Sequence, residues 1–113
     1  MDTFYALAEP TRRKIIELLA RYGELFATEI SDRFDVSAPA ISQHLKVLRE
    51  AELVTVEKRA QQRIYRLNPQ AVDQVEDWAR QVTSLWNQRF DALEVVLKQE
   101  KEKLLQVQKR KDE

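Results

Sequence analysis

The sequence predicts a mainly α-helical protein with one short β-hairpin. Its 113 residues include a single glycine and three prolines. Because these two residue types interrupt regular structure, their scarcity implies long helices. Lysine and arginine together number 19, as do aspartate and glutamate, and hydrophobic residues make up 43% of the chain. This is the balance of one globular domain rather than of a disordered chain.

Two helices are predicted in the first third of the chain. Residues 10–20 carry apolar side chains at helical spacing, and the run ends at Gly23, a residue suited to a helix C-terminus. A shorter helix of about two turns is expected to begin at Thr28 as its N-cap and to end near residues 35–36.

A third helix is predicted to begin after Ser37, a good N-cap, with Pro39 in its first turn, where the missing N–H has no cost. On a helical wheel, Ile41, Leu45 and Leu48 form an inward stripe. The outward positions carry small or polar side chains: Pro39, Ser42, Gln43 and Lys46.

Residues 53–67 predict the β-hairpin, because β-branched and aromatic residues flank a polar tip at residues 58–63. Between Glu57 and Arg66 the chain has four basic residues and one acid, although its total charge is zero. Positive charge is therefore concentrated on the hairpin.

One long helix is predicted from Gln70 to about Gln108, since Asn68 and Pro69 form a helix start and neither glycine nor proline follows. It would be roughly 58 Å long and cannot bury its own apolar stripe. We infer a homodimer that pairs this helix with a second copy; the alternative is a helix that folds back near residues 83–84. The expected dimer interface is aromatic and aliphatic: Phe4, Tyr5, Leu7, Val75, Trp78, Val82, Trp86, Phe90 and Leu93.

Helix, tight turn, helix and β-hairpin, in this order, form a winged helix-turn-helix, which is a DNA-binding architecture. Three segments resemble the ArsR family of bacterial and archaeal repressors: ALAEPTRRKIIELL (6–19), SAPAISQHLKVLREAELV (37–54) and RIYRLNP (63–69). The resemblance implies that residues 37–51 form the recognition helix and 58–63 the wing tip. We therefore expect a DNA-binding part at 1–69 and a dimerisation helix with a charged tail at 70–113, within one structural domain.

Most of the predicted DNA-binding residues have an expected partner on the DNA. Gln43 is the candidate base reader, because a carboxamide pairs bidentately with adenine. Ser37, Ser42 and Lys46 suit phosphates, as do the free N–H groups at a helix N-terminus. Arg59 and Arg63 at the wing tip are expected to contact phosphates or the minor groove. His44, the only histidine, is either a packing residue or, as the resemblance implies, a donor to phosphate. The full predicted set is Ser37, Pro39, Ser42, Gln43, His44, Lys46, Arg59 and Arg63.

The sequence departs from the family pattern at two turns and at the metal sites. Glu52 stands where relatives commonly carry glycine after the recognition helix, and residues 60–62 stand at the wing tip, where relatives usually carry glycine. Phe26 and Thr28 occupy the positions of the cysteine pair in arsenic- and cadmium-sensing relatives, and no histidine follows His44. The tail around Trp78, Trp86 and residues 89–93 resembles a subgroup without a characterised metal. We therefore expect no metal site and no cofactor.

The sequence as a whole predicts a homodimeric repressor that binds a pseudo-palindromic operator in double-stranded DNA. The alternative is a winged-helix protein-protein interaction module that uses the long C-terminal helix. An enzyme is not expected, because the chain has no cysteine, one histidine and no glycine-rich loop. We expect a cytoplasmic protein, since the chain has neither a signal peptide nor a membrane span. A small ligand, a partner protein or simple titration all remain open as the signal.

Overall fold

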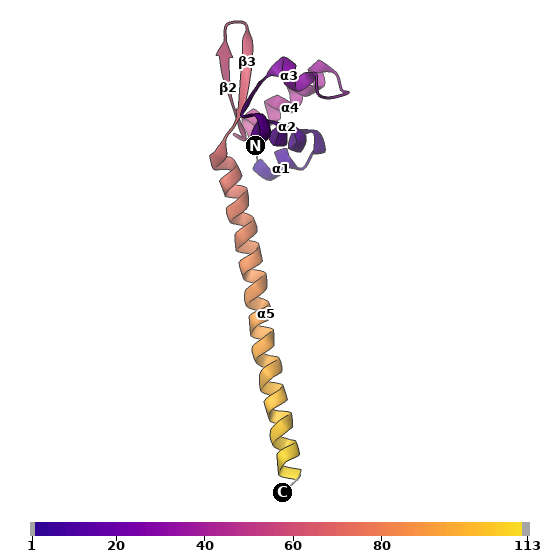
Figure 1. Ribbon diagram of the computed structural model, residues 1–113, viewed down its shortest axis with the longest axis vertical. Helices are drawn as coiled ribbons and strands as arrows, with labels where there is room; N and C mark the ends of the chain where they lie inside the picture. The colour runs from indigo at the N-terminus through magenta and orange to yellow at the C-terminus, as the bar shows by residue number, and fades with distance from the viewer. Residues whose placement is uncertain (1, 112–113) are drawn as a thin grey trace. The chain divides into compact units, whose positions relative to one another are not determined.

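The computed structural model describes residues 2–111 and confirms the mainly α-helical class (Figure 1). By compactness the chain divides into two units, residues up to Glu76 and residues from Asp77 onward. The boundary lies inside the last helix, and the predicted functional division after residue 69 stays a prediction. In order, the elements are α1 (Thr3–Leu7), α2 (Pro10–Tyr22), β1 (Glu24–Phe26), α3 (Ala27–Ser31), α4 (Ala38–Glu50), β2 (Val54–Arg59), β3 (Gln62–Leu67) and α5 (Pro69–Lys111).

The core of the first unit forms where α2, α3 and α4 meet the sheet. Ile15 and Leu19 of α2 are almost completely buried, as is Ile30 of α3. The predicted inward stripe of α4, Ile41, Leu45 and Leu48, is confirmed and belongs to the same cluster: these side chains are at most 2% exposed. Helix α2 ends at the predicted Gly23, which adopts a φ of 85° and donates its N–H to the carbonyl of Leu19.

The predicted β-hairpin is confirmed, and it belongs to a three-stranded antiparallel sheet in the order β1-β3-β2. Tyr65 of the central strand pairs with Leu25 on one side and Val56 on the other. The tip is shorter than predicted, because both strands continue into the polar stretch and only Ala60 and Gln61 form the turn.

Two short elements were not predicted, and one predicted helix start is wrong. Strand β1 pairs with β3 up to Phe26, so α3 begins directly after it rather than after Thr28. Phe26 is the N-cap residue, and its N–H donates to Oε1 of Glu29 at 2.9 Å. Phe34 lies beyond the end of α3 and packs against the core instead. Strand β1 and helix α1 are too short to produce a periodic sequence pattern.

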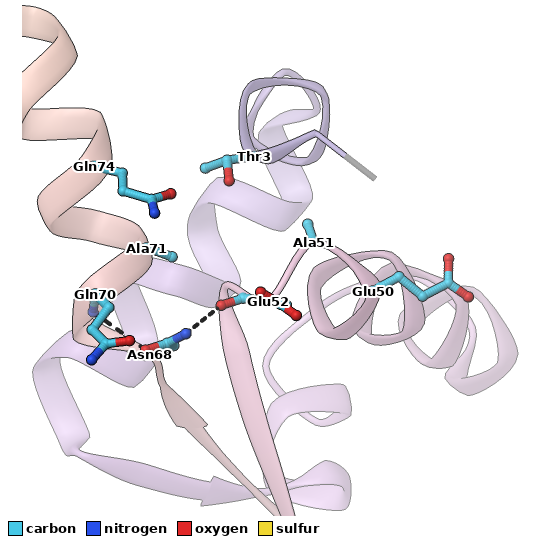
Figure 2. Close-up of a pocket in the computed structure, with 8 residues that line it drawn as sticks. All are labelled: Thr3, Glu50, Ala51, Glu52, Asn68, Gln70, Ala71 and Gln74. Atoms are coloured by element: carbon cyan, nitrogen blue, oxygen red, sulfur yellow. Dashed lines mark hydrogen bonds between the residues drawn. The ribbon is translucent and has the colours of Figure 1, made fainter.

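Helix α4 ends in a Schellman motif with a glutamate at the left-handed position. Leu53 donates its N–H to the carbonyl of Leu48, and Glu52 donates to Arg49, both at 3.0 Å. Glu52 has a φ of 60°, a conformation that glycine adopts without steric cost. Figure 2 shows Asn68 beside this turn, where its Nδ2 donates to the carbonyl oxygen of Glu52 at 2.7 Å and its Oδ1 accepts from the N–H of Gln70. The turn borders a polar pocket of about 360 Å³.

Helix α5 runs without interruption from Pro69 to Lys111 (Figure 1). The alternative in which the chain folds back near residues 83–84 is therefore wrong. Ala71, in its first turns, belongs to the core of the first unit. Over residues 76–111 every side chain is exposed. Across residues 2–111, no helix combines the length and the apolar character that a membrane span requires.

Replacing Glu52 by glycine should stabilise the protein. A side chain in the left-handed region costs roughly 1–2 kcal/mol, and Glu52→Gly removes that cost while leaving the carbonyl that Asn68 binds. We expect the free energy of unfolding to rise by about 1 kcal/mol in urea denaturation. The matched control is Glu52→Ala, which removes the carboxylate but keeps the Cβ atom and should give no comparable gain. An equal gain from both variants would assign the effect to charge instead of backbone conformation.

Candidate nucleic-acid interface

Helix α4, the expected recognition helix, begins as predicted. Ser37 has an extended backbone, and its Oγ accepts a hydrogen bond from the N–H of Ala40 at 3.3 Å. Pro39 lies in the first turn of α4, where no N–H is needed. Both residues are exposed, so the positive end of the helix and its remaining N–H groups face solvent.

The outward face of α4 adjoins the wing, by which we mean the hairpin of β2 and β3. Ser42, Gln43 and Lys46 are exposed, and they line an open hollow of about 270 Å³ together with Arg63 of β3. The structure thus gathers four of the predicted DNA-binding residues around one concavity. Their chemistry is complementary to DNA: a hydroxyl, a carboxamide and two cations.

The same hollow contains a basic residue that the sequence analysis missed. Arg49 of α4 lines it, is exposed, and follows Ser42 and Lys46 at helical spacing. The 42, 46, 49 series is an i, i+4, i+7 pattern that continues the outward face by one turn. Extending the helical wheel to the end of α4 would have found this residue.

On the wing, two of the basic side chains are held by carboxylates. Arg66 forms ion pairs with Glu24 at 2.7 Å and with Glu57 at 2.9 Å, and these hydrogen-bonded partners raise its pKa above the ordinary value. Arg59 lies between the same two carboxylates, at 3.6 Å from Glu24 and 3.5 Å from Glu57. Glu24 comes from β1, the strand that was not predicted, so these pairs were not expected.

The positive charge of the wing is therefore distributed unequally. Among the described residues Arg63 and Lys58 form no ion pair, whereas Arg59 is about half exposed and shared between two acids. Glu24 and Glu57 offset two of the four cations. The surplus charge thus lies on Arg63 and Lys58, and Arg63 is the one that faces the recognition helix across the hollow.

His44 is turned inward from the recognition helix and is partly buried. Its Nδ1 lies 3.4 Å from Nη1 of Arg12 and 3.8 Å from Oε2 of Glu9. Glu9 is the N-cap of α2 and accepts from the N–H of Arg12 at 3.0 Å. Desolvation raises the pKa of Glu9, but this hydrogen bond, the charge of a protonated His44 and hydrogen bonds from Thr11 together outweigh it, so the pKa is lowered overall. His44 thus differs from its neighbours in having a buried partner.

The predicted dimer residues fall into two groups. Leu7 and Val75 are half-buried in the first unit, whereas Phe4 and Tyr5 are exposed on α1. The remaining side chains are about half exposed on α5, with Trp86 and Phe90 one turn apart in an edge-to-face contact at 5.0 Å between ring centroids. The exposed group comprises Trp78, Val82, Trp86, Phe90 and Leu93.

Within residues 2–111 there is no group of three or more histidine, cysteine, aspartate or glutamate side chains placed to hold a metal ion.

Comparisons with known proteins identify the family. The family described as "Bacterial regulatory protein, arsR family" matches residues 9–56. The transcriptional repressor SdpR of Bacillus subtilis is 36% identical over 77 residues, which cover 68% of this chain and 84% of SdpR. The transcriptional regulator Rv2034 of Mycobacterium tuberculosis is 48% identical over 64 residues, covering 57% of this chain and 59% of Rv2034.

A solved structure agrees with these relatives. The ArsR-like transcriptional regulator from Rhodococcus sp. RHA1 matches with a TM-score of 0.75 and 26% identity, covering 84% of this chain and 86% of that one. The matched family region includes all of α2 and α4 and the start of β2. The chain belongs to the ArsR family and is a DNA-binding transcriptional regulator with a winged helix-turn-helix fold.

Proposed function

We propose that the protein is a homodimeric repressor that binds a pseudo-palindromic operator through two recognition helices in successive major grooves. The observation that carries the proposal is the hollow between α4 and the wing, where Ser42, Gln43 and Lys46 lie opposite Arg63. In this proposal it represses by occluding a promoter, performs no catalysis, and acts in the cytoplasm with the DNA it binds.

The roles within the interface follow from side-chain chemistry. Gln43 reads a base edge, because its carboxamide can donate to and accept from one adenine. Lys46 and Arg63 bind phosphates, and Arg49 extends this contact along the helix. Ser37 and Ser42 donate hydrogen bonds from their hydroxyl groups to phosphates of the DNA backbone, next to the exposed N-terminus of α4.

Dimerisation is supported by the apolar side chains that α5 leaves exposed. Trp78, Val82, Trp86, Phe90 and Leu93 each expose about half of their surface. Aromatic residues in this number are typical of a protein interface rather than of a solvated helix. A second copy of the same helix supplies a matching surface with closed two-fold symmetry.

The interaction-module alternative is less well supported than DNA binding. Both named relatives are transcriptional regulators, and the matched family region contains the recognition helix. An exposed face of polar and basic residues on α4 suits a phosphate backbone, whereas a protein contact would favour apolar anchors there.

Substitutions in the hollow should separate base reading from phosphate binding. We expect Gln43→Ala to weaken operator binding by about 1–3 kcal/mol per half-site while hardly changing affinity for unrelated DNA. Arg63→Ala should weaken both and reduce the slope of log affinity against log salt by about one. The operator is first selected from random-sequence DNA, and affinities are then measured by fluorescence anisotropy over a salt series.

Arg59→Ala is the matched control, because it removes the same charge from the same hairpin. Its guanidinium is already shared by Glu24 and Glu57, so its loss should change the salt slope less than Arg63→Ala does. If Gln43→Ala weakened both DNAs equally while the arginine variants affected only the operator, the assigned roles of helix and wing would be reversed.

Dimerisation should depend on the apolar side chains of α5. In the full chain, Trp86→Glu is expected to produce monomers in light scattering, because it places a charge in the proposed interface, and to weaken operator binding to that of one half-site. Gln88→Glu, on another side of the same helix, is the control and should leave the dimer intact. Truncation before Trp78 should also give monomers, whereas truncation after Leu97 should have little effect.

A dimer that survived both Trp86→Glu and truncation before Trp78 would show that the interface lies elsewhere in the chain. In that case α1, with its exposed Phe4 and Tyr5, would be the next surface to vary.

A further inference from the structure

Arg12 connects the first helix of the chain to the recognition helix. It is the one charged residue that is buried within the described chain, with 9% of its surface exposed. Its Nε donates to the carbonyl oxygen of Ala6 at 2.7 Å, and its Nη2 donates to that of Tyr5 at 3.2 Å. The remaining terminal nitrogen, Nη1, lies 3.4 Å from Nδ1 of His44. One guanidinium thus contacts both α1 and α4.

A hydrogen bond across this contact is possible for only one of the two neutral forms of the His44 ring. Arginine has only donors, so a hydrogen bond between Nη1 of Arg12 and Nδ1 of His44 requires Nδ1 to be the acceptor. A neutral imidazole with an unprotonated Nδ1 carries its hydrogen on Nε2. The tautomer therefore follows from the chemistry of the partner.

Glu9, the other neighbour of Nδ1, favours the opposite tautomer of His44. The carboxylate of Glu9 would favour a proton on Nδ1, and its Oε2 lies 3.8 Å from that atom. This separation is longer than a hydrogen bond, and the same Oε2 already accepts from the backbone N–H of Arg12 at 3.0 Å. Nη1 of Arg12 lies closer to Nδ1 than the carboxylate of Glu9 does, and it has no other acceptor among the described residues. The contact with Arg12 therefore decides the position of the hydrogen.

We propose that Arg12 is a positioning residue that holds His44 in its Nε2–H tautomer, so that the recognition helix presents a preset hydrogen-bond donor to an operator phosphate. Within residues 2–111 Nε2 forms no hydrogen bond, and the side chain as a whole is 23% exposed. His44 also follows Gln43, the proposed base reader, directly along α4. The phosphate contact rests on the proposed function; the tautomer does not.

The arrangement makes the state of α1 relevant to DNA binding. Arg12 reaches His44 while two of its other nitrogens are held by carbonyls of α1, near the exposed Phe4 and Tyr5. A change in α1 would therefore move the guanidinium and release Nδ1. His44 would then carry its hydrogen on Nδ1, the nitrogen near Glu9, and Nε2 would no longer be a donor to phosphate.

The tautomer is tested on the free protein by nitrogen-15 NMR of the imidazole. His44 is the only histidine in the chain, so a long-range proton–nitrogen correlation spectrum of the labelled protein contains one ring to assign. At a pH where its shifts no longer change and the ring is neutral, we expect Nε2 protonated and Nδ1 unprotonated. Arg12→Met, which removes every donor but keeps an apolar stem, should shift the population toward Nδ1–H. A wild-type ring with its proton on Nδ1 would overturn the proposal.

The phosphate contact is tested with two variants that leave Arg12 in place. The amide nitrogen of glutamine reaches the position of Nε2, whereas asparagine is too short and occupies only the position of Nδ1. We expect His44→Gln to retain binding to operator and to unrelated DNA within about threefold. His44→Asn should weaken both about ten- to a hundredfold but leave the salt slope unchanged, because a neutral imidazole donates a hydrogen bond without neutralising a phosphate charge.

These variants remain informative if Arg12→Met fails to fold, which thermal unfolding of each protein would show. Retention by His44→Asn with loss by His44→Gln would place Nδ1 at the DNA and refute the proposal. Equal, wild-type affinity of both variants would refute the phosphate contact. If the wild-type protein bound no DNA, the proposed function would fail, while the NMR result would still decide the role of Arg12.

Discussion

The burial of one face of α4 is the constraint on which the rest of the interface depends. Ile41, Leu45 and Leu48 are at most 2% exposed, and they fix the rotation of the helix about its own axis. Once this rotation is fixed, the helical periodicity sets which side chains face outward. Ser42, Gln43 and Lys46 are therefore presented because their neighbours are buried. The apolar residues of α4 specify the position of the polar ones.

The wing depends on a second constraint, which is the pairing of β3 with a strand from each side. Strand β1 brings Glu24 opposite Arg66, and β2 brings Glu57 to the same guanidinium. Ion pairs between side chains this exposed add little stability. Their effect is on the distribution of positive charge, because they pair Arg59 and Arg66 with carboxylates. The remaining charge faces the recognition helix through Arg63.

Elements with a strong periodic pattern could be predicted from the sequence. The prediction agrees with the structure for helices α2, α4 and α5 and for the β2–β3 hairpin, because each is long enough to show apolar spacing between recognisable end signals. Strand β1 and helix α1 have three and five residues, and their existence depends on tertiary contacts. The error at Thr28 has this cause, since pairing with β3 holds the chain extended up to Phe26 and fixes where α3 begins.

For the site, the sequence predicted which residues face outward but not how they interact. Periodicity placed Ser42, Gln43 and Lys46 correctly on the surface of α4. The inward partner of His44 depends on Arg12, which is 32 residues away in the chain and belongs to another helix. The distribution of charge on the wing likewise depends on Glu24, which lies 42 residues from Arg66. Local patterns do not report such long-range pairs.

The exposed second unit has a consequence for the lifetime of the protein. Over residues 77–111 every side chain is exposed, so in an isolated chain the helix gains little from burial and depends mainly on helix propensity and on pairs such as Lys103 with Glu100. Any partner that covers its apolar side chains stabilises it by mass action. An uncovered helix opens more often and is more accessible to proteases. Cellular turnover would then remove unpartnered chains first, and the level of the regulator would be limited by its own assembly.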